Sequence, residues 1–220
     1  MTNRTIKVYK DLQGENEVWA AKTRTVLAEK KIGMINIIGS PGCGKTTLLE
    51  KIGSLLQARL PFAVLEGDVE TTRDAERLDQ KGITVSQLLT SGACHLEAKL
   101  VHYALLDLPL DTLRLVVVEN VGNLVCPAEF DVGEHAKIAV LSVTEGEDKP
   151  IKYPLLFSEA KAVLITKTDL LPYIPYDIDA CENYIRQVNP SVPIFRLSTL
   201  NGVGMQEWLD WLEELIEKVS

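Results

Sequence analysis

The chain has 220 residues, of which 46% are hydrophobic and 25% charged, the balance of a globular protein with a sizeable core. Its net charge of −8 argues against nucleic acid or an anionic membrane surface as the main partner. No apolar run is long enough to cross a membrane and no signal peptide opens the chain, so we expect a cytoplasmic protein.

Residues 3–31 are polar and favour a helix, and Val18, Trp19, Val26 and Leu27 are spaced to form an apolar stripe on it. From residue 33 onward, short apolar runs alternate with helical patterns. The predicted strands are Met34–Ile38, Phe62–Leu65, Ile83–Leu88, Leu115–Val118, Ile138–Val143, Ala162–Ile165 and Ile194–Leu197. The predicted helices are 46–58, 72–80, 95–106, 150–159, 178–188 and 204–218.

Several of these strands are apolar throughout, which is typical of parallel strands buried on both faces. Their alternation with helices predicts an α/β fold with a mostly parallel, doubly wound sheet and functional groups at the carboxyl ends of the strands. No linker, repeat or low-complexity tract interrupts the pattern. We therefore expect residues 1–220 to form a single domain, with 1–31 as an N-terminal helical segment packed on it.

The stretch Gly-Ser-Pro-Gly-Cys-Gly-Lys-Thr at 39–46 fits the phosphate-binding pattern G-x-x-x-x-G-K-[ST] at every fixed position. It lies between an apolar strand and a helix, the context in which backbone N–H groups and a helix N-terminus bind polyphosphate. We expect Lys45 to reach the β- and γ-phosphates and the Thr46 hydroxyl to bind Mg²⁺. The predicted contacts of this P-loop with the nucleotide come from Gly39, Pro41, Gly42, Cys43, Gly44, Lys45, Thr46 and Thr47.

Carboxylates follow two of the predicted strands. Glu119 and Gly122 come after the fourth strand, where the carboxylate can approach Mg²⁺ and the glycine can sense the γ-phosphate. Asp68 and Asp74 follow the second strand, and we assign Asp74 to Mg²⁺ and Asp68 to the attacking water, a division that could be reversed. Asp74 could instead belong to an exposed helix face. The residues expected to carry hydrolysis are Lys45, Asp68, Asp74 and Glu119.

The run 166–169, Thr-Lys-Thr-Asp, approximates the guanine-recognition motif N-K-x-D, with threonine in place of asparagine. The Asp169 carboxylate can accept two hydrogen bonds that guanine donates and adenine cannot, while Lys167 would lie along the base. Backbone N–H groups near the guanine oxygen are expected from Ser198, Thr199 and Leu200. The sequence therefore predicts GTP with Mg²⁺, and the effect of Thr166 on base selectivity stays open.

A second constellation combines Cys94 and His95 with Cys126. Thiolate and imidazole are ligands for Zn²⁺, Ni²⁺ and Cu⁺ rather than for hard cations. Three ligands leave a site incomplete, and a two-fold axis joining two copies would complete it for one or two ions. Alternatively, each cysteine is a small buried hydrophobe and His95 caps a helix. For His102 and His135 we expect packing or surface roles.

Together, these motifs resemble the HypB family, the nickel-incorporation GTPases of [NiFe]-hydrogenase maturation. The resemblance covers roughly residues 30–218, and its most specific stretch, Glu119–Pro127, joins the nucleotide-sensing segment to a metal ligand. The other stretches that carry it are Gly39–Thr46, Gly67-Asp68 with Asp74-Ala75, Cys94-His95-Leu96, Thr144-Glu145-Gly146 and Lys167–Asp169.

The resemblance implies a SIMIBI-type GTPase that forms a homodimer in the presence of GTP. It implies Ni²⁺ or Zn²⁺ bound by Cys94, His95 and Cys126 at or near the dimer interface. It also implies work with a zinc-bearing HypA-type partner to deliver nickel to the hydrogenase large subunit. Residues 1–30 contain no Cys or His, so we do not expect the nickel-storing extension of some members.

Two other readings stay open at this stage. One is a related nickel, cobalt or zinc accessory GTPase of the urease type, although this chain lacks the Cys-Pro-His cluster typical of the urease proteins. The other is a nucleotide-switched dimer in which zinc is purely structural. The ligand types accept both Ni²⁺ and Zn²⁺ and so do not choose between these readings.

Overall fold

The structure, a computed structural model, describes residues 3–56, 59–68, 72–90 and 92–219. Within these residues, seven strands form one parallel sheet in the order β3-β2-β4-β1-β5-β6-β7. The strands are β1 (Gly33–Gly39), β2 (Phe62–Asp68), β3 (Thr84–Leu89), β4 (Leu115–Glu119), β5 (Ala136–Ser142), β6 (Ala162–Thr166) and β7 (Ile194–Arg196). The seven predicted strands and the predicted parallel α/β sheet are confirmed.

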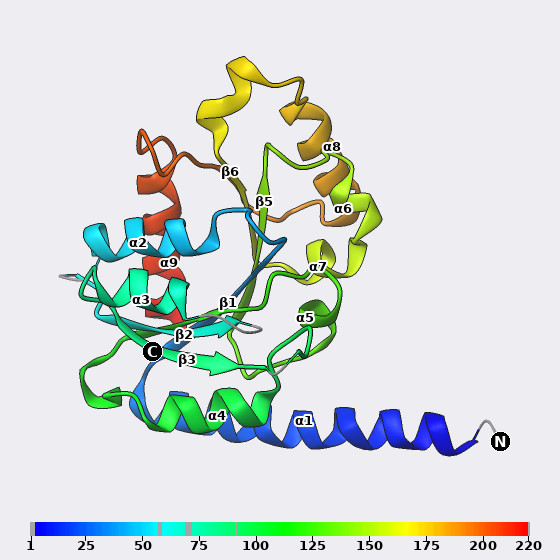
Figure 1. Ribbon diagram of the computed structural model, residues 1–220, viewed down its shortest axis with the longest axis vertical. Helices are drawn as coiled ribbons and strands as arrows, with labels where there is room; N and C mark the ends of the chain where they lie inside the picture. The colour runs from blue at the N-terminus through cyan, green and yellow to red at the C-terminus, as the bar shows by residue number, and fades with distance from the viewer. Residues whose placement is uncertain (1–2, 57–58, 69–71, 91, 220) are drawn as a thin grey trace.

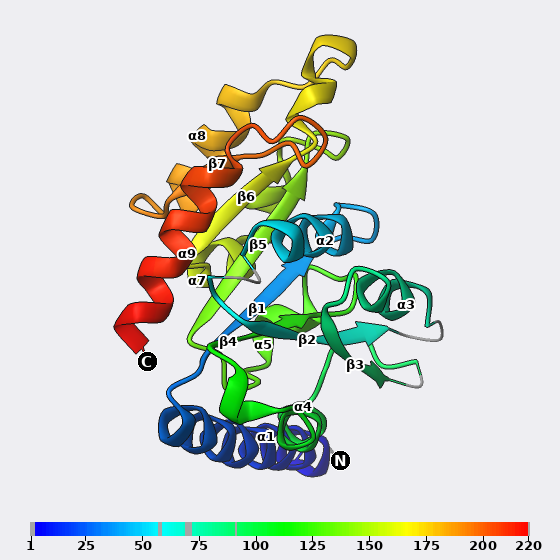
Figure 2. The same cartoon turned by 90° about the vertical axis from the view of Figure 1, so that its left-hand side faces the viewer.

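Helices cover both faces of the sheet (Figures 1 and 2). Apolar side chains of α2, α3 and α9 pack on one face, and those of α1, α4, α5, α7 and α8 pack on the other. The helices are α1 (Asn3–Lys30), α2 (Lys45–Leu56), α3 (Arg73–Asp79), α4 (Ala98–Leu106), α5 (Cys126–Glu129), α6 (Lys149–Lys152), α7 (Pro154–Glu159), α8 (Ile178–Val188) and α9 (Met205–Val219), with 3₁₀ turns at Leu110–Thr112 and Thr168–Tyr173. None of the helices in the described part of the chain has the length and apolarity of a membrane span.

The helices differ from the predictions in three places. The predicted helix 150–159 is two helices, because Pro154 has no N–H to continue α6 and instead begins α7. The predicted helix 95–106 begins only at Ala98, with Glu97 as its N-cap, so His95 lies in the preceding loop and does not cap the helix. The short helix α5 was not predicted. Residues 57–58 of the predicted helix 46–58, and residues 69–71 before Asp74, lie outside the described residues.

The long helix α1 packs alongside α4 (Figure 1). Its buried side is formed by Ala20, Thr23 and Leu27, whereas Val18 is 54% exposed, so Val18 does not belong to the apolar stripe as predicted. Thr23 Oγ1 lies 3.2 Å from Nδ1 of buried His102. His135 is also used in packing, because its Nδ1 accepts a hydrogen bond from the Met34 N–H at 3.0 Å.

Candidate nucleotide site and candidate metal site

A cavity of about 430 Å³ lies at the carboxyl ends of the central strands, between the P-loop and α3. It brings together all four residues predicted to carry hydrolysis. The lining residues are Pro41, Gly42, Gly44, Lys45, Thr46, Thr47, Glu66, Gly67, Asp68, Asp74, Arg77, Glu119, Asn120, Val121, Gly122 and Lys167. This is the edge at which ligands bind in open parallel sheets.

The P-loop has the backbone conformation that its glycines allow. Gly42 and Gly44 have φ angles of 75° and 98°, a region that other residues seldom adopt. A side chain on Gly39 would place its Cβ 2.6 Å from the Cys43 sulfur. The Lys45 ammonium donates to two carbonyls of the loop at 3.3 and 3.4 Å, and α2 begins at this residue. The loop thus surrounds a cation at the N-terminus of a helix, as a phosphate site requires.

Two buried carboxylates adjoin the cavity from neighbouring strands. Glu66 on β2 and Glu119 on β4 are partners in the sheet register and are 2% and 4% exposed. Glu119 accepts a hydrogen bond from Thr46 Oγ1 at 2.7 Å, and Oε2 of each glutamate has no hydrogen-bond partner within the described residues. Burial raises the pKa of Glu119 to about 7, and burial together with Glu119 raises that of Glu66 to about 8. Oxygen atoms without a partner next to the P-loop threonine suit Mg²⁺, which prefers oxygen ligands.

The two aspartates assigned to Mg²⁺ and water take different positions. Asp68 ends β2 and lines the cavity. Asp74 lies in the first turn of α3 with its side chain 40% exposed, and it pairs with Arg77 at 2.9 Å. Arg77 in turn pairs with Glu50 of α2 at 3.0 Å. Asp74 therefore belongs both to an exposed helix face and to the cavity wall, and the division of roles with Asp68 stays a prediction.

The predicted base-recognition residues gather on the strand ends beyond the P-loop. The Lys167 ammonium donates to the Gly42 carbonyl at 2.6 Å and lines the cavity. Asp169 accepts a hydrogen bond from Ser198 Oγ at 2.5 Å, so the two segments assigned to guanine lie side by side, and their role in base recognition stays a prediction. The Leu200 side chain is 81% exposed, which leaves its backbone as the part able to contact a base.

Thr166 does more than the sequence indicated. Its hydroxyl donates to the Cys43 carbonyl at 2.6 Å and thereby ties β6 to the P-loop. The departure from asparagine thus adds a contact to the phosphate site. Cys43 itself is fully buried, and burial raises the pKa of its thiol.

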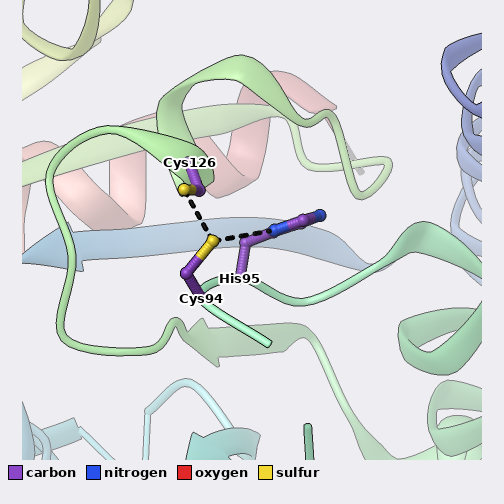
Figure 3. Close-up of side chains that lie close together, drawn as sticks. All are labelled: Cys94, His95 and Cys126. Atoms are coloured by element: carbon purple, nitrogen blue, oxygen red, sulfur yellow. Dashed lines mark hydrogen bonds between the residues drawn. The ribbon is translucent and has the colours of Figure 1, made fainter. Parts of the chain in front are cut away.

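Cys94, His95 and Cys126 form a compact group (Figure 3). Their ligand atoms all lie within 4.8 Å of one another. The Cys94 sulfur is 2.6 Å from the Cys126 sulfur and 3.7 Å from Nδ1 of His95, and both cysteines are free. Cys94 and His95 come from the loop before α4, whereas Cys126 is the first residue of α5. The soft ligand set that the sequence suggested is therefore assembled within one chain.

The environment of this group acts in opposite ways on its imidazole and thiol ligands. The His95 ring stacks on Phe130 at a centroid distance of 3.9 Å, and burial lowers its pKa below the usual 6.5. Neutral imidazole, the form that binds metals, is therefore favoured near neutral pH. The hydrogen bond with Cys126, followed by burial, raises the pKa of Cys94. Metal binding there would have to release a thiol proton.

Direct contacts connect the two sites. The Asn123 amide donates to the Cys94 carbonyl at 3.2 Å, joining the loop after β4 to the loop before α4. A side chain on Gly67 would place its Cβ 2.8 Å from the Leu96 side chain, next to His95. A Cβ on Gly122 would lie 2.8 Å from the Pro41 ring. The loop after β4 thus lies between the two sites and contacts the P-loop on one side and the loop before α4 on the other.

Sequence reasoning missed some functional candidates. Glu66 lies just after its predicted strand, and its two-residue spacing from Asp68 is the signal that could have found it. Glu145 and Lys149, to which the sequence assigned no role in the site, form a largely buried ion pair. Lys149 also donates to the Ser40 hydroxyl of the P-loop at 2.7 Å. Their i, i+4 spacing was the available signal.

Comparison with known proteins agrees with this geometry. Residues 33–196 match the family model described as CobW/HypB/UreG, nucleotide-binding domain. The hydrogenase maturation factor HypB of Azotobacter vinelandii is 46% identical over 96% of this chain and 70% of its own length. The chain belongs to the HypB family. This membership confirms the resemblance seen in the motifs and the P-loop NTPase fold of the SIMIBI type.

Solved HypB structures share the fold over nearly the whole chain. HypB from Helicobacter pylori, crystallised in complex with nickel, has a TM-score of 0.89 and 35% identity, covering 93% of this chain and 96% of that one. HypB from Archaeoglobus fulgidus has a TM-score of 0.87 and 33% identity, covering 92% and 99%. The protein is thus placed among hydrogenase maturation factors with a nucleotide-binding domain.

Proposed function

We propose that this HypB-family protein is a GTP-hydrolysing metallochaperone that binds Ni²⁺ or Zn²⁺ and drives nickel insertion into the [NiFe]-hydrogenase large subunit. The observation that carries the proposal is the assembly of Cys94, His95 and Cys126 at the end of the loop after β4, which lines the nucleotide cavity through Asn120, Val121 and Gly122. A relative of the same family crystallised with nickel supports the choice of metal. A HypA-type protein is the proposed partner, and the cytoplasm the proposed compartment.

In this proposal the cavity residues divide the chemistry of hydrolysis. Lys45 contacts the phosphates, and the N–H groups of the P-loop orient them. Thr46, Asp74 and Glu119 would hold Mg²⁺, which when bound neutralises phosphate charge. Asp68 orients the attacking water. Guanine is recognised by Lys167, Asp169 and the backbone of 198–200.

The metal site is coupled to the nucleotide through the segment 119–126. GTP orders this segment and positions Asp68 and Asp74, and it favours a homodimer in which a second copy completes the coordination of one or two ions. Hydrolysis relaxes the segment and loosens the metal. Such transfer requires that the metal bind the two nucleotide states with different affinity, because equal affinities transmit nothing.

Nickel titrations of the GDP form and of the form with a non-hydrolysable GTP analogue test the proposal. We expect different dissociation constants and a nucleotide-dependent monomer–dimer equilibrium, measured by calorimetry and light scattering. Equal constants in the two forms would contradict the coupling. Zinc retained without change through GTP turnover would favour a structural zinc site instead.

A further inference from the structure

A chain of buried polar side chains crosses the core beneath the two sites. It consists of Glu134, Asn36 and Asn120, which are 8%, 0% and 1% exposed. Asn36 lies in the middle of β1, whose other residues are apolar or glycine. A buried amide among apolar side chains is costly unless its hydrogen bonds are made, so its position requires a reason.

The hydrogen bonds among these three side chains all point from Asn120 towards Glu134. The Asn120 amide donates to Asn36 Oδ1 at 3.2 Å, and the Asn36 amide donates to Glu134 Oε1 at 3.3 Å. Glu134 Oε2 accepts from the Val132 N–H at 2.8 Å. Because each amide has a donor and an acceptor partner, neither can rotate without losing bonds. These hydrogen bonds therefore fix the orientation of the Asn120 side chain.

Within this row of hydrogen-bonded side chains, Asn120 is the residue that contacts the segments of both sites. Its Oδ1 accepts from the Leu96 N–H at 3.3 Å and from the Val121 N–H at 3.0 Å. Leu96 follows the metal ligand His95, while Val121 belongs to the cavity wall with Glu119. One carbonyl oxygen thus holds the loop before α4 and the loop after β4 together.

We propose that Asn36 is the positioning residue that couples the nucleotide state to the metal ligands. Held by Glu134, it fixes the Asn120 amide, so that a displacement of the loop after β4 carries the Leu96 N–H and His95 with it. Asn36 lines neither the nucleotide cavity nor the metal group, so it acts through Asn120 alone. This inference rests on the proposed coupling of nucleotide and nickel binding.

The test is the ratio of the nickel dissociation constants in the GDP and GTP-analogue forms. Couplings between sites are typically about 5- to 150-fold. In Asn36→Val, which removes both hydrogen bonds but suits a strand, we expect the ratio to fall to within about threefold of one. Nucleotide affinity and the number of nickel ions per chain should stay at the wild-type values. A loss of fold would change all of these together.

Glu134, at the other end of this row of hydrogen-bonded side chains, offers a second pair of variants. Glu134→Gln keeps an acceptor for the Asn36 amide and should preserve the ratio, whereas Glu134→Ala should lower it. This pair decides the question even if Asn36→Val does not fold. A ratio that stays at the wild-type value in both Asn36→Val and Glu134→Ala would overturn the inference.

Asn189→Ala is the matched control. The Asn189 amide donates to three carbonyls at 3.0 to 3.2 Å, at the end of α8. Its replacement removes an equally well bonded amide outside both sites and should leave the ratio unchanged. If the wild-type protein itself shows a ratio of one, the proposed function fails at its coupling step. A wild-type ratio retained in the Asn36 and Glu134 variants refutes only the role of Asn36.

Discussion

The phosphate end of the cavity and the metal group are built in different ways. The P-loop is one continuous stretch in which Lys45 and Thr46 are both 7% exposed, and its shape comes from glycine φ angles and backbone contacts. The metal ligands come from two loops, with Cys94 exposed and Cys126 half-buried. Those loops are joined by side-chain hydrogen bonds from Asn120 and Asn123.

This difference separates a fixed site from a responsive one. A short loop anchored at both ends by a buried strand and a helix opens locally only at a high free-energy cost. Exposed loops held by single side chains move at a smaller free-energy cost. Under the proposed coupling, we therefore expect the metal ligands, rather than the P-loop, to shift between the nucleotide states.

Removing one metal ligand should give the largest effect. In Cys126→Ala we expect the loss of stoichiometric nickel, because two ligands cannot replace three, while GTP affinity stays at the wild-type value. Metal analysis after dialysis measures the first quantity and calorimetry the second. Cys181→Ala, at a buried cysteine in the core, is the control and should load fully. Full loading of Cys126→Ala would place the metal elsewhere.

Replacing Lys45, the cation of the P-loop, tests the nucleotide site separately from the metal group. Lys45→Ala should lower the rate constant of GTP hydrolysis by about 10²–10³-fold, the usual loss for one group that stabilises charge in the transition state. Single-turnover hydrolysis measures it. Nickel binding to the nucleotide-free variant should be unchanged. A parallel loss of nickel would show that the two sites are not separable.

A substitution among the base-recognition residues should change which nucleotide binds rather than the rate of hydrolysis. In Asp169→Asn the ratio of GTP to XTP affinity should fall by at least about 10²-fold, because the amide cannot accept both guanine hydrogen bonds. Competition with a fluorescent nucleotide measures the two affinities. Unchanged GTP affinity in this variant would refute the assignment of Asp169 to guanine.

The smallest effect concerns stability and pH. The pKa of Glu66 is about 8 in the folded protein against a usual 4.5, so the folded state holds this proton more tightly than the unfolded chain does. Its contribution to stability is complete below pH 4.5 and is lost as pH rises through 8. The free energy of unfolding of nucleotide-free protein should therefore fall over this range relative to Glu66→Gln. Urea denaturation of both proteins across these pH values measures the difference, and parallel curves would contradict the shifted pKa.

The sequence predicted the parts of the molecule that depend on local pattern. Apolar runs predicted the seven strands, and the spacing of glycines, lysine and threonine predicted the P-loop. What it could not predict depends on neighbours across the sheet. The spacing of Glu66 from Asp68 could have drawn attention to it, but its place beside Glu119 depends on the register in which β2 and β4 pair. The role of Asn36 likewise depends on Asn120, which is 84 residues away.

The metal group, too, could be predicted only in part from the sequence. Its residue types were evident in the sequence, but their meeting depends on the loop before α4 lying against the start of α5. The start of α4 at Ala98 rather than at His95 leaves that loop free of helical geometry. The motif Cys94-His95 alone contains no signal for this boundary.

The close approach of Gly122 to Pro41 brings the loop after β4 against the P-loop. Even one added methyl group there would lie 2.8 Å from the proline ring, so the loop already rests against the P-loop with no space left to approach it. Under the proposed coupling, we therefore expect a change at Pro41 of the P-loop to reach the loop after β4 by direct contact at Gly122.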